Sequence, residues 1–272
     1  MLEAILAFLA GLLIGSFLNV CVFRLPRDLS VVRPRSFCPE CEKPIAWYDN
    51  IPVVSYLLLR GRCRHCQASI RLRYLMVELV TAAAFALCVA ALGPTLAALK
   101  YSVFSAILIT LLATDLEERI LPDEFTLGGV VVGVAFAALV PIEAGIVTFF
   151  LSGALGLRMA SIAEALVSAW VAGGAIWLVA WLYEKFRHRE GMGFGDVKMI
   201  AMIGAFLGFQ ETLLTLILAS VLGSVAGVAY VLITKKDMAT YELPFGSFIG
   251  LAGLVVALWG HVMRVWISAP AG

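Results

Sequence analysis

The sequence contains little charge. Of its 272 residues only 14% are Asp, Glu, Lys or Arg, whereas 62% are hydrophobic and the mean hydropathy is +0.97. A soluble globular domain has about 25% charged residues, so this composition excludes an ordinary soluble protein. The net charge of +1 says little about nucleic acid or acidic partners, because the distribution of charge matters more here. We expect no nucleic-acid partner. The chain also lacks internal repeats and low-complexity tracts.

The amino terminus lacks the charge order of a secretory signal. Residues 1–23 are apolar, but their early charge is Glu3, and Arg24 and Arg27 follow them. A signal peptide has its positive charge first and ends at a small-residue cleavage site. We therefore predict that residues 1–23 stay in place as the first transmembrane helix, with a cleaved signal as the alternative.

In place of charge, the sequence has a series of long apolar runs. Several reach the roughly 20 residues that an α-helix needs to cross a bilayer. Hydropathy predicts about eight transmembrane helices, and hence an all-α polytopic membrane protein. The predicted helices cover Leu2–Phe23, Tyr74–Leu92, Leu96–Ala113, Phe125–Val140, Ile162–Tyr183, Val197–Phe209, Leu213–Ile233 and Pro244–Val265. The stretch Pro141–Leu157 fits a loop, a re-entrant segment or an extended fourth helix, and the role of residues 141–161 stays open.

Lysine and arginine are distributed unequally between the two sides of the membrane. With the predicted helices alternating in direction, all but three of the 20 Lys and Arg residues lie on one side. The exceptions are Lys100, Arg158 and Arg264. Positive charge marks the cytoplasmic face, so the polar segment 24–73 is predicted to be cytoplasmic and both termini to lie outside the cytoplasm.

That polar segment contains four of the six cysteines. They form two Cys-x-x-Cys pairs, Cys38 with Cys41 and Cys63 with Cys66. Two such pairs are typical of a tetrahedral zinc site, and four protein ligands leave no open coordination position, so the ion is expected to be structural. A segment this small needs such support to fold. Residues 24–73 are therefore predicted to form a zinc-binding domain, with free or redox-active thiols as the alternative.

Two aspartates lie beside apolar runs. Asp115 follows the third run, and Asp196 closes the sequence Gly193-Phe194-Gly195-Asp196. A carboxylate at the centre of a membrane helix costs about 2.5–3.5 kcal/mol, so such residues are rare and usually functional. The charge pattern places both at the cytoplasmic side, where two carboxyl groups that meet can share a proton and activate water, as in aspartic proteases. The alternative for Asp196 is a plain helix N-cap.

Residues near the aspartates are expected to support them. Gly193 and Gly195 would allow backbone conformations closed to other residues and a close approach of substrate. Lys198 would either pair with a nearby carboxylate or mark the cytoplasmic interface, and we favour the second. Glu117 and Glu118 are expected to form a solvated acidic loop at the membrane surface.

Further motifs run in order along nearly the whole chain. They are Gly15-Ser16-Phe17-Leu18-Asn19-Val20 with Arg24-Leu25-Pro26, both Cys-x-x-Cys pairs around Trp47-Tyr48-Asp49-Asn50-Ile51-Pro52, Arg73-Tyr74, Val77-Glu78-Leu79, Asp115 with Leu121-Pro122-Asp123, Gly191-Met192-Gly193-Phe194-Gly195-Asp196-Val197-Lys198, and Leu243-Pro244-Phe245-Gly246. This series resembles the type IV prepilin peptidases, also called leader peptidase/N-methyltransferases, a group of GxGD-type membrane aspartic proteases. One departure is Ser247, where that family often has proline, and we expect Ser247 to lie away from the aspartates.

The resemblance implies a function. Asp115 and Asp196 match the catalytic pair of the family, within a peptidase domain that would cover residues 74–272. Such enzymes sit in the bacterial inner membrane and cleave the leader of prepilins and pseudopilins, for type IV pili or type II secretion, after a glycine at the cytoplasmic face. Members with the cysteine-bearing segment also methylate the new amino terminus with S-adenosylmethionine.

The cofactor site and two alternatives stay open. No glycine-rich nucleotide-binding fingerprint is visible, so the methyl-donor site is unknown, and Glu78 and the segment Trp47–Asn50 are candidates from position alone. A GxGD-type intramembrane protease of other substrates is one alternative function. A non-enzymatic transporter, whose paired carboxylates couple to protons or cations, is the other.

Overall fold

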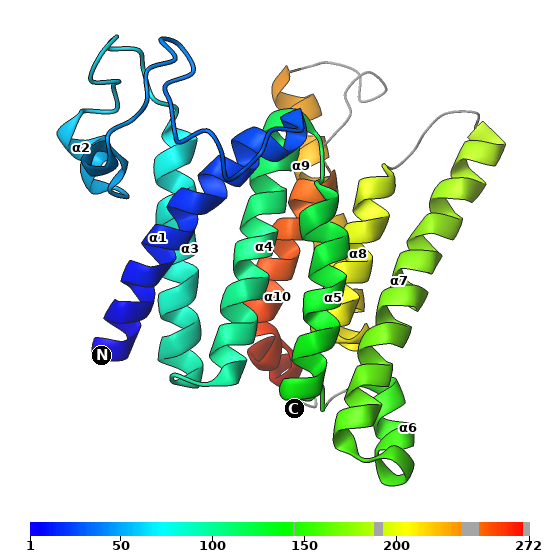
Figure 1. Ribbon diagram of the computed structural model, residues 1–272. Helices are drawn as coiled ribbons and strands as arrows, with labels where there is room; N and C mark the ends of the chain where they lie inside the picture. The colour runs from blue at the N-terminus through cyan, green and yellow to red at the C-terminus, as the bar shows by residue number, and fades with distance from the viewer. Residues whose placement is uncertain (144, 188–192, 235–244, 269–272) are drawn as a thin grey trace. The chain divides into compact units, whose positions relative to one another are not determined.

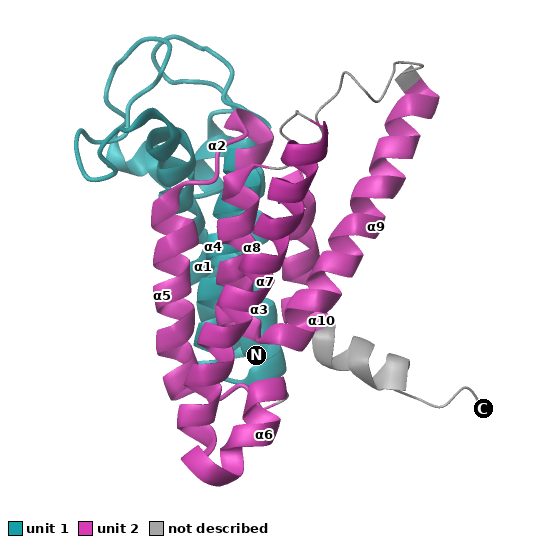
Figure 2. Ribbon diagram, turned by 90° about the vertical axis from the view of Figure 1, so that its right-hand side faces the viewer, with its two compact units in different colours: residues 1–114 teal, residues 115–272 magenta. Residues whose placement is uncertain are grey.

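The structure is a computed structural model that describes residues 1–143, 145–187, 193–234 and 245–268, with side chains up to residue 259. Over these residues the regular elements are helices, accompanied by two isolated β-bridges. The all-α prediction is therefore confirmed. The chain divides into two compact units, unit 1 from Met1 to Thr114 and unit 2 from Asp115 to Gly272 (Figure 2).

Unit 1 is built on long helices that flank a polar segment (Figure 1). Its elements are α1 (Leu2–Arg24), η1 (Leu25–Arg27), η2 (Trp47–Asn50), α2 (Val54–Leu58), α3 (Leu72–Leu92) and α4 (Leu96–Glu118), the last of which ends four residues into unit 2. Helices α1 and α3 pack closely because two glycines face α3. A β-carbon on Gly11 would lie 2.6 Å from the Cα of Ala82, and one on Gly15 would lie 2.7 Å from the Cα of Glu78. Small residues four apart let membrane helices approach in this way.

Unit 2 surrounds one short helix with longer ones. Its elements are α5 (Asp123–Leu139), α6 (Ile146–Leu155), α7 (Leu157–Arg187), α8 (Phe194–Leu207), α9 (Phe209–Thr234) and α10 (Phe245–Ser268). Helix α8 contacts α5, α7, α9 and α10, and most of its residues are buried. Glycine again permits close packing, since a β-carbon on Gly204 would lie 2.9 Å from the backbone carbon of Ser168 in α7.

A buried glutamate joins three of these helices. Glu164 of α7 is fully buried. Its Oε2 accepts from the backbone N–H groups of Val147 (2.7 Å) and Thr148 (3.3 Å) at the start of α6. Its Oε1 accepts from the Ser168 hydroxyl (2.9 Å) and from the backbone N–H of Phe209 at the start of α9 (3.1 Å). The carboxylate thereby pairs N–H groups that a helix start leaves without partners, and so it caps α6 and α9 together.

Five helices in the described parts of the chain are long and apolar enough to cross a membrane: α1, α3, α4, α7 and α9. The predicted count of eight is not confirmed. Each predicted segment coincides with a helix, but α5 and α8 contain only 17 and 14 residues. At 1.5 Å per residue α8 is about 21 Å long, shorter than the roughly 30 Å hydrocarbon layer. The ambiguous stretch Pro141–Leu157 contains α6.

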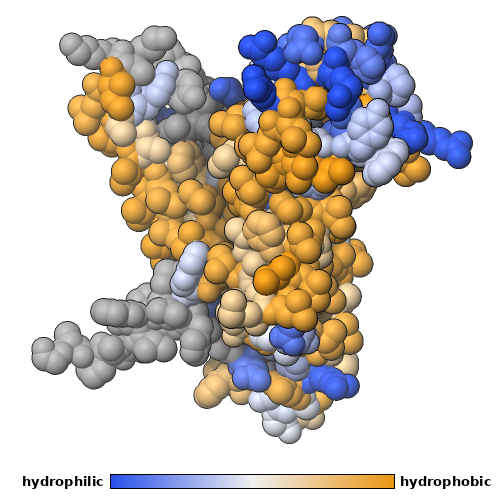
Figure 3. Space-filling model, turned by 90° about the vertical axis from the view of Figure 1, so that its left-hand side faces the viewer, coloured by the Kyte–Doolittle hydropathy of each residue, from blue (hydrophilic) through white to orange (hydrophobic). Residues whose placement is uncertain are grey.

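The surface of the helices is apolar, as in a membrane protein. On α1 the side chains of Leu6, Leu9, Leu13 and Phe17 are each at least 50% exposed. On the face in Figure 3, hydrophobic residues cover the helices and hydrophilic residues gather toward their ends. A soluble monomer rarely exposes an apolar surface of this extent, so lipid is the expected surrounding, and the chain is a multi-pass membrane protein.

Candidate active site and cysteine cluster

The two predicted aspartates lie in unit 2, at opposite ends of two different helices. Asp115 is in the last turn of α4, and Asp196 is in the first turn of α8. Both side chains are buried, with exposed fractions of 6% and 8%. The N-cap of α8 is Gly193, and no side chain caps this helix. The alternative in which Asp196 serves as the N-cap is therefore wrong, and its carboxylate is available for another role.

Gly246, in the first turn of α10, shows how close the two carboxyl groups are. A β-carbon built on Gly246 would lie 2.9 Å from Oδ1 of Asp196 and 3.1 Å from Oδ2 of Asp115. The two oxygens are therefore no farther apart than the sum of these distances. Since a hydrogen bond between oxygens is about 2.5–3.0 Å long, one water molecule can contact both carboxyl groups. A side chain at position 246 would occupy the same space.

Ser247 contacts one member of the pair, Asp115, directly. Its hydroxyl donates a hydrogen bond of 2.6 Å to Oδ2 of Asp115, and the side chain is only 8% exposed. The expectation that Ser247 lies away from the aspartates is wrong. No local motif indicates this contact, because Ser247 is 132 residues from Asp115 and α10 brings it there only in the folded chain. The bond holds Oδ2 of Asp115 in one orientation.

Of the two glycines before Asp196, Gly195 has a steric role, and neither needs a special backbone conformation. Gly193 has φ −68° and ψ 145°, which any residue adopts, and Gly195 lies within α8. The expectation of backbone conformations closed to other residues is therefore wrong here. A β-carbon on Gly195 would come within 3.1 Å of the Leu121 side chain. Glycine at this position lets the chain between α4 and α5 pass close to the start of α8.

The remaining charged residues near the pair differ from expectation in two ways. The ammonium group of Lys198 forms an ion pair with the carboxylate of Asp123, at the start of α5. The structure thus shows the pairing that we considered but did not favour. Glu117 and Glu118 belong to the last turn of α4 and are half-buried, so they do not form a solvated loop. They lie at the same helix end as Asp115.

The arrangement suits acid–base chemistry on one water molecule. Two carboxyl groups that face one point repel each other when both are charged, and sharing one proton relieves that repulsion. An ionised carboxylate can then accept a proton from water while its protonated partner donates a hydrogen bond to a substrate carbonyl. Either carboxyl group could take either role, so neither role is assigned to one residue.

In unit 1 the four predicted cysteines form one cluster. The sulfur atoms of Cys38, Cys41, Cys63 and Cys66 all lie within 4.8 Å of one another. The sulfurs of Cys38 and Cys66 are 3.8 Å apart. A tetrahedral zinc ion with Zn–S bonds of about 2.3 Å holds its sulfurs about 3.8 Å apart, so the cluster has the size of such a site.

The backbone around each cysteine pair follows the same pattern twice. Around the first pair, the N–H of Cys38 donates to the carbonyl of Lys43 (3.0 Å), and that of Glu42 donates to the carbonyl of Cys38 (2.8 Å). Around the second pair, Cys63 donates to Ala68 (2.9 Å) and Gln67 to Cys63 (3.0 Å). Glu42 and Gln67 have φ values of 55° and 60°. Each turn curls so that two sulfurs face one point, as a metal requires.

The electrostatics of the second pair also favour a cation. The backbone N–H groups of Cys66 and His65 donate to the Cys63 sulfur and lower the pKa of that thiol to about 7. The N–H of Ala68 donates to the Cys66 sulfur, but desolvation and the three neighbouring thiols outweigh it and raise the pKa of Cys66 to about 12. Four thiolates repel one another unless a positive ion lies among them. The donor set and its spacing therefore fit a metal ion.

Comparison with known proteins places both sites in one family. The model of the Bacterial Peptidase A24 N-terminal domain matches residues 9–92, and the model of the Type IV leader peptidase family matches residues 102–228. The chain is 33% identical to the prepilin leader peptidase/N-methyltransferase of Aeromonas hydrophila, over 96% of this chain and 92% of that protein. The chain belongs to the type IV leader peptidase family.

Other members of the type IV leader peptidase family are similarly close. The Pseudomonas aeruginosa protein of the same name is 33% identical over 96% of this chain and 92% of its own. The Myxococcus xanthus protein is 38% identical over 86% of this chain and 65% of its own. No solved structure matches the chain. The region matched by the leader peptidase model contains Asp115 and Asp196, and the region matched by the N-terminal model contains the cysteine cluster.

Proposed function

We propose that this chain is a membrane-embedded aspartic endopeptidase that cleaves the leader of type IV prepilins and pseudopilins. The observation that carries the proposal is the pair of buried carboxyl groups, Asp115 and Asp196, that face one point beside Gly246. Family membership supports the substrate class, because the relatives are named prepilin leader peptidase/N-methyltransferase. The cut is proposed to follow a glycine at the cytoplasmic face of the bacterial inner membrane, the face that positive charge marks.

The position of the two aspartates suits the chemistry of a prepilin substrate. A prepilin has a basic leader before an apolar helix, so its cleavage point lies where water meets lipid. Asp115 and Asp196 lie at helix ends rather than mid-helix, which is where such a point would arrive. Glu117 and Glu118, in the same last turn as Asp115, supply the negative charge that a basic leader needs nearby.

We also propose that the chain methylates the amino terminus that cleavage creates. When bound, S-adenosylmethionine supplies the methyl group: the amine lone pair forms the new N–C bond, the C–S bond breaks, neutral S-adenosylhomocysteine leaves, and the amine loses a proton to water. The proposed domain organisation is the one predicted from the sequence. Residues 74–272 form the peptidase domain, and residues 24–73 form a cytoplasmic zinc-binding domain after the first helix.

The peptidase proposal is tested by substituting each aspartate. Asp115→Asn and Asp196→Asn each keep the side-chain size but remove the acid, so both purified proteins should remain folded and lose cleavage of a prepilin peptide. The products are weighed by mass spectrometry, with and without S-adenosylmethionine. Cleavage at the wild-type rate by either variant would exclude the pair as catalyst. Glu143→Gln, an exposed acid of unit 2, is the matched control and should cleave normally.

The same assay separates the alternative functions. A prepilin peptidase should require the leader and the glycine before the cut, whereas an intramembrane protease of other substrates should not. A transporter should carry protons or cations into vesicles irrespective of added prepilin. Loss of cleavage when the glycine is replaced by a larger residue in the peptide is the result expected here.

Zinc is the metal we propose for the cysteine cluster. Cys38→Ser or Cys63→Ser removes one of four sulfur ligands, so the purified variant should lose most of its zinc, and methylation should fall with it. Metal content is measured by elemental analysis. Cys88→Ala, which removes a buried thiol of α3 outside the cluster, is the control and should keep its zinc. Unchanged zinc in both cluster variants would exclude these ligands.

A further inference from the structure

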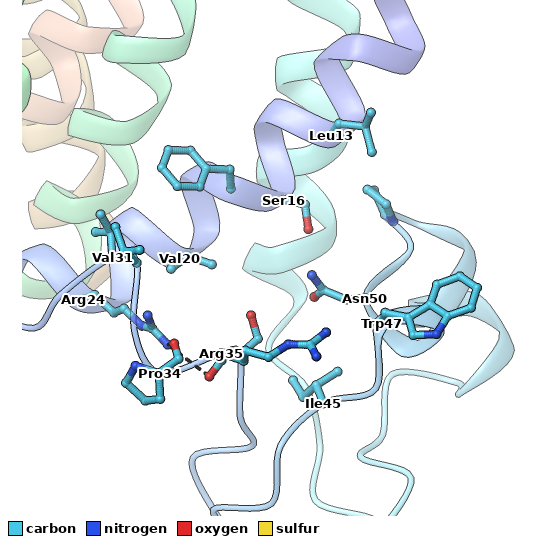
Figure 4. A pocket seen from close by; sticks show the side chains of 14 residues that line it. Leu13, Ser16, Val20, Arg24, Val31, Pro34, Arg35, Ile45, Trp47 and Asn50 are labelled. Carbon is cyan, nitrogen blue, oxygen red and sulfur yellow. Dashed lines mark hydrogen bonds between the residues drawn. The ribbon is translucent and has the colours of Figure 1, made fainter.

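A cavity of about 400 Å³ lies within unit 1. Helix α1 forms one wall, and the polar segment between η1 and α2 forms the other (Figure 4). Pockets for small ligands commonly measure about 300–1,000 Å³, so this one has the size for a molecule built from a nucleoside and an amino acid. It shares no residue with the aspartate pair or with the cysteine ligands.

The two walls of the cavity differ in chemistry. The α1 wall is mainly apolar, with Leu13, Phe17 and Val20. The opposite wall carries a charged and a polar group, Arg35 and Asn50, neither of which forms a side-chain hydrogen bond or ion pair within the described residues. Figure 4 shows the Arg35 guanidinium pointing toward the segment that carries Asn50 and Trp47. Donors without partners thus stand opposite an apolar surface, which is the usual composition of a ligand site.

An aromatic ring stands at the rim of this cavity. Trp47 lines the cavity, yet its side chain is 72% exposed. An indole held in this way offers a flat face for stacking with another ring. Arg24, the other arginine in the lining, is buried, and its guanidinium donates to the carbonyls of Ser30 (2.9 Å) and Pro34 (2.7 Å). Arg24 therefore shapes the wall, and Arg35 is the cation left for an anionic group.

The segment over the cavity is held in a strained conformation. Val53 follows the lining residue Pro52 and has φ 62°, which is rare for a β-branched residue. Its N–H donates to Oε2 of the buried Glu78 of α3 (2.8 Å), and the side chain of Ser16 in the cavity wall is hydrogen-bonded to the same carboxyl group. Such strain persists where the surroundings enforce it, and it concentrates at functional sites. Glu78 thus places a carboxyl group directly behind Ser16.

The two cysteine turns support the polar segment that forms the second wall of the cavity at two places. Ser36 and Ile45 line the cavity and flank the first cysteine turn, and the N–H of Ile45 donates to the carbonyl of Ser36 (2.8 Å). From the second turn, Arg64 donates to both oxygens of Asp49 at 2.7 and 2.6 Å, next to Asn50. This bond holds the pKa of Asp49 below its usual value. A metal in the cluster would therefore keep the cavity in shape.

We propose that this cavity is the binding site for the methyl donor S-adenosylmethionine, which rests on the proposed methyltransferase activity. Trp47 would hold the adenine ring, Arg35 the carboxylate of the methionine part, and Asn50 the ring or ribose polar atoms. Ser16, which is hydrogen-bonded to Glu78, would lie near the positive groups of the ligand. The position agrees with the matched regions, since the aspartates fall in the leader peptidase match and every residue that lines the cavity falls in residues 9–92.

Equilibrium binding tests the proposal without relying on activity. The full chain in nanodiscs is titrated with S-adenosylhomocysteine by calorimetry, and tritiated S-adenosylmethionine is crosslinked by ultraviolet light and mapped by mass spectrometry. Trp47→Ala and Arg35→Ala should each weaken binding about tenfold or more, and Arg35→Lys should restore part of it. The label should map to the cavity wall. Zinc content and prepilin cleavage should stay at wild-type levels, which shows that both units remain folded.

Two matched variants serve as controls. Leu58→Ala removes an apolar side chain of α2 that is 78% exposed, and Arg62→Ala removes an exposed arginine of the same segment; neither residue lines the cavity. Both should bind like the wild type.

The possible failures are distinguishable from one another. Wild-type affinity in Trp47→Ala and Arg35→Ala would place the donor elsewhere and overturn the cavity, while the proposed methyltransferase would stand. Absence of binding by the wild type would overturn the cavity and the methylation proposal together, leaving the peptidase untouched. Displacement of the ligand by phosphatidylglycerol, with no label in the cavity wall, would show that an anionic lipid occupies it instead.

Discussion

Gly246→Ala is the most direct probe of the aspartate pair. The change adds one methyl group at a point 2.9 Å from Oδ1 of Asp196 and 3.1 Å from Oδ2 of Asp115, whereas ordinary contacts begin at 3.4 Å. The two carboxyl groups must therefore move away by about 0.3–0.5 Å. Because a misplacement of about 1 Å can cost 100-fold in rate, we expect kcat/KM for a prepilin peptide to fall about tenfold, or about 1.4 kcal/mol.

The stability of Gly246→Ala should rise slightly or stay unchanged, although its activity falls. Alanine favours an α-helix over glycine by about 1 kcal/mol, and position 246 lies in the first turn of α10. Loss of activity without loss of stability would therefore report displacement of the carboxyl groups rather than unfolding. The cleavage rate is measured by mass spectrometry, and the melting temperature is measured on the same preparation.

Gly174→Ala is the matched control for this experiment. Gly174 lies within α7, and a β-carbon there would meet nothing within 4 Å. The same exchange should leave cleavage near the wild-type value and should raise stability by about 1 kcal/mol, because alanine favours the helix and meets no neighbour. If Gly246→Ala cleaved as fast as Gly174→Ala, the carboxyl groups could not be facing position 246, and the catalytic geometry argued above would be wrong.

Two further substitutions test contacts in unit 2. Ser247→Ala removes the hydrogen bond to Asp115 and should lower kcat about tenfold with KM unchanged. Ser247→Thr keeps a hydroxyl group and should recover most of the rate. An alanine variant with wild-type kcat would show that the hydroxyl does not position the acid. Glu164→Ala leaves the buried N–H groups at the starts of α6 and α9 without an acceptor and should lower the free energy of unfolding by about 3 kcal/mol or more, measured by thermal unfolding. The exposed Glu143→Ala should be neutral, and equal melting temperatures for the two would contradict the capping role.

Much of this protein was predictable from local features of its sequence. Apolar runs separated by charged segments determine the membrane helices, because each run must bury its own backbone polar groups to enter lipid. Two Cys-x-x-Cys pairs determine the cluster, since each pair needs only its own tight turn to bring two sulfurs together. The prediction that Asp115 and Asp196 are functional rests on the cost of placing acids beside apolar helices.

Helix length and helix ends were less predictable. The central helix α8 has 14 residues. Its apolar run, Val197–Phe209, is shorter than the roughly 20 residues of a membrane helix, yet hydropathy alone counts it among the helices that meet lipid. Its surroundings are other helices, so an apolar sequence there reflects packing in unit 2 rather than contact with a bilayer. The same ambiguity left residues 141–161 without a prediction, although they contain α6 and the start of α7.

The contacts between distant segments depend on the tertiary structure alone. Nothing local to Gly246 or Ser247 indicates that α10 would bring them against Asp115 and Asp196, because that meeting requires the chain at Asp115 and the first turns of α8 and α10 to come together. Nor does the sequence near Glu164 indicate that one carboxylate would cap two other helices. Composition and periodicity decided what kind of protein this is and which charged residues are costly to place beside lipid. Both are properties of single segments in their solvent. Packing decided which of those residues meet, since that depends on every helix at once.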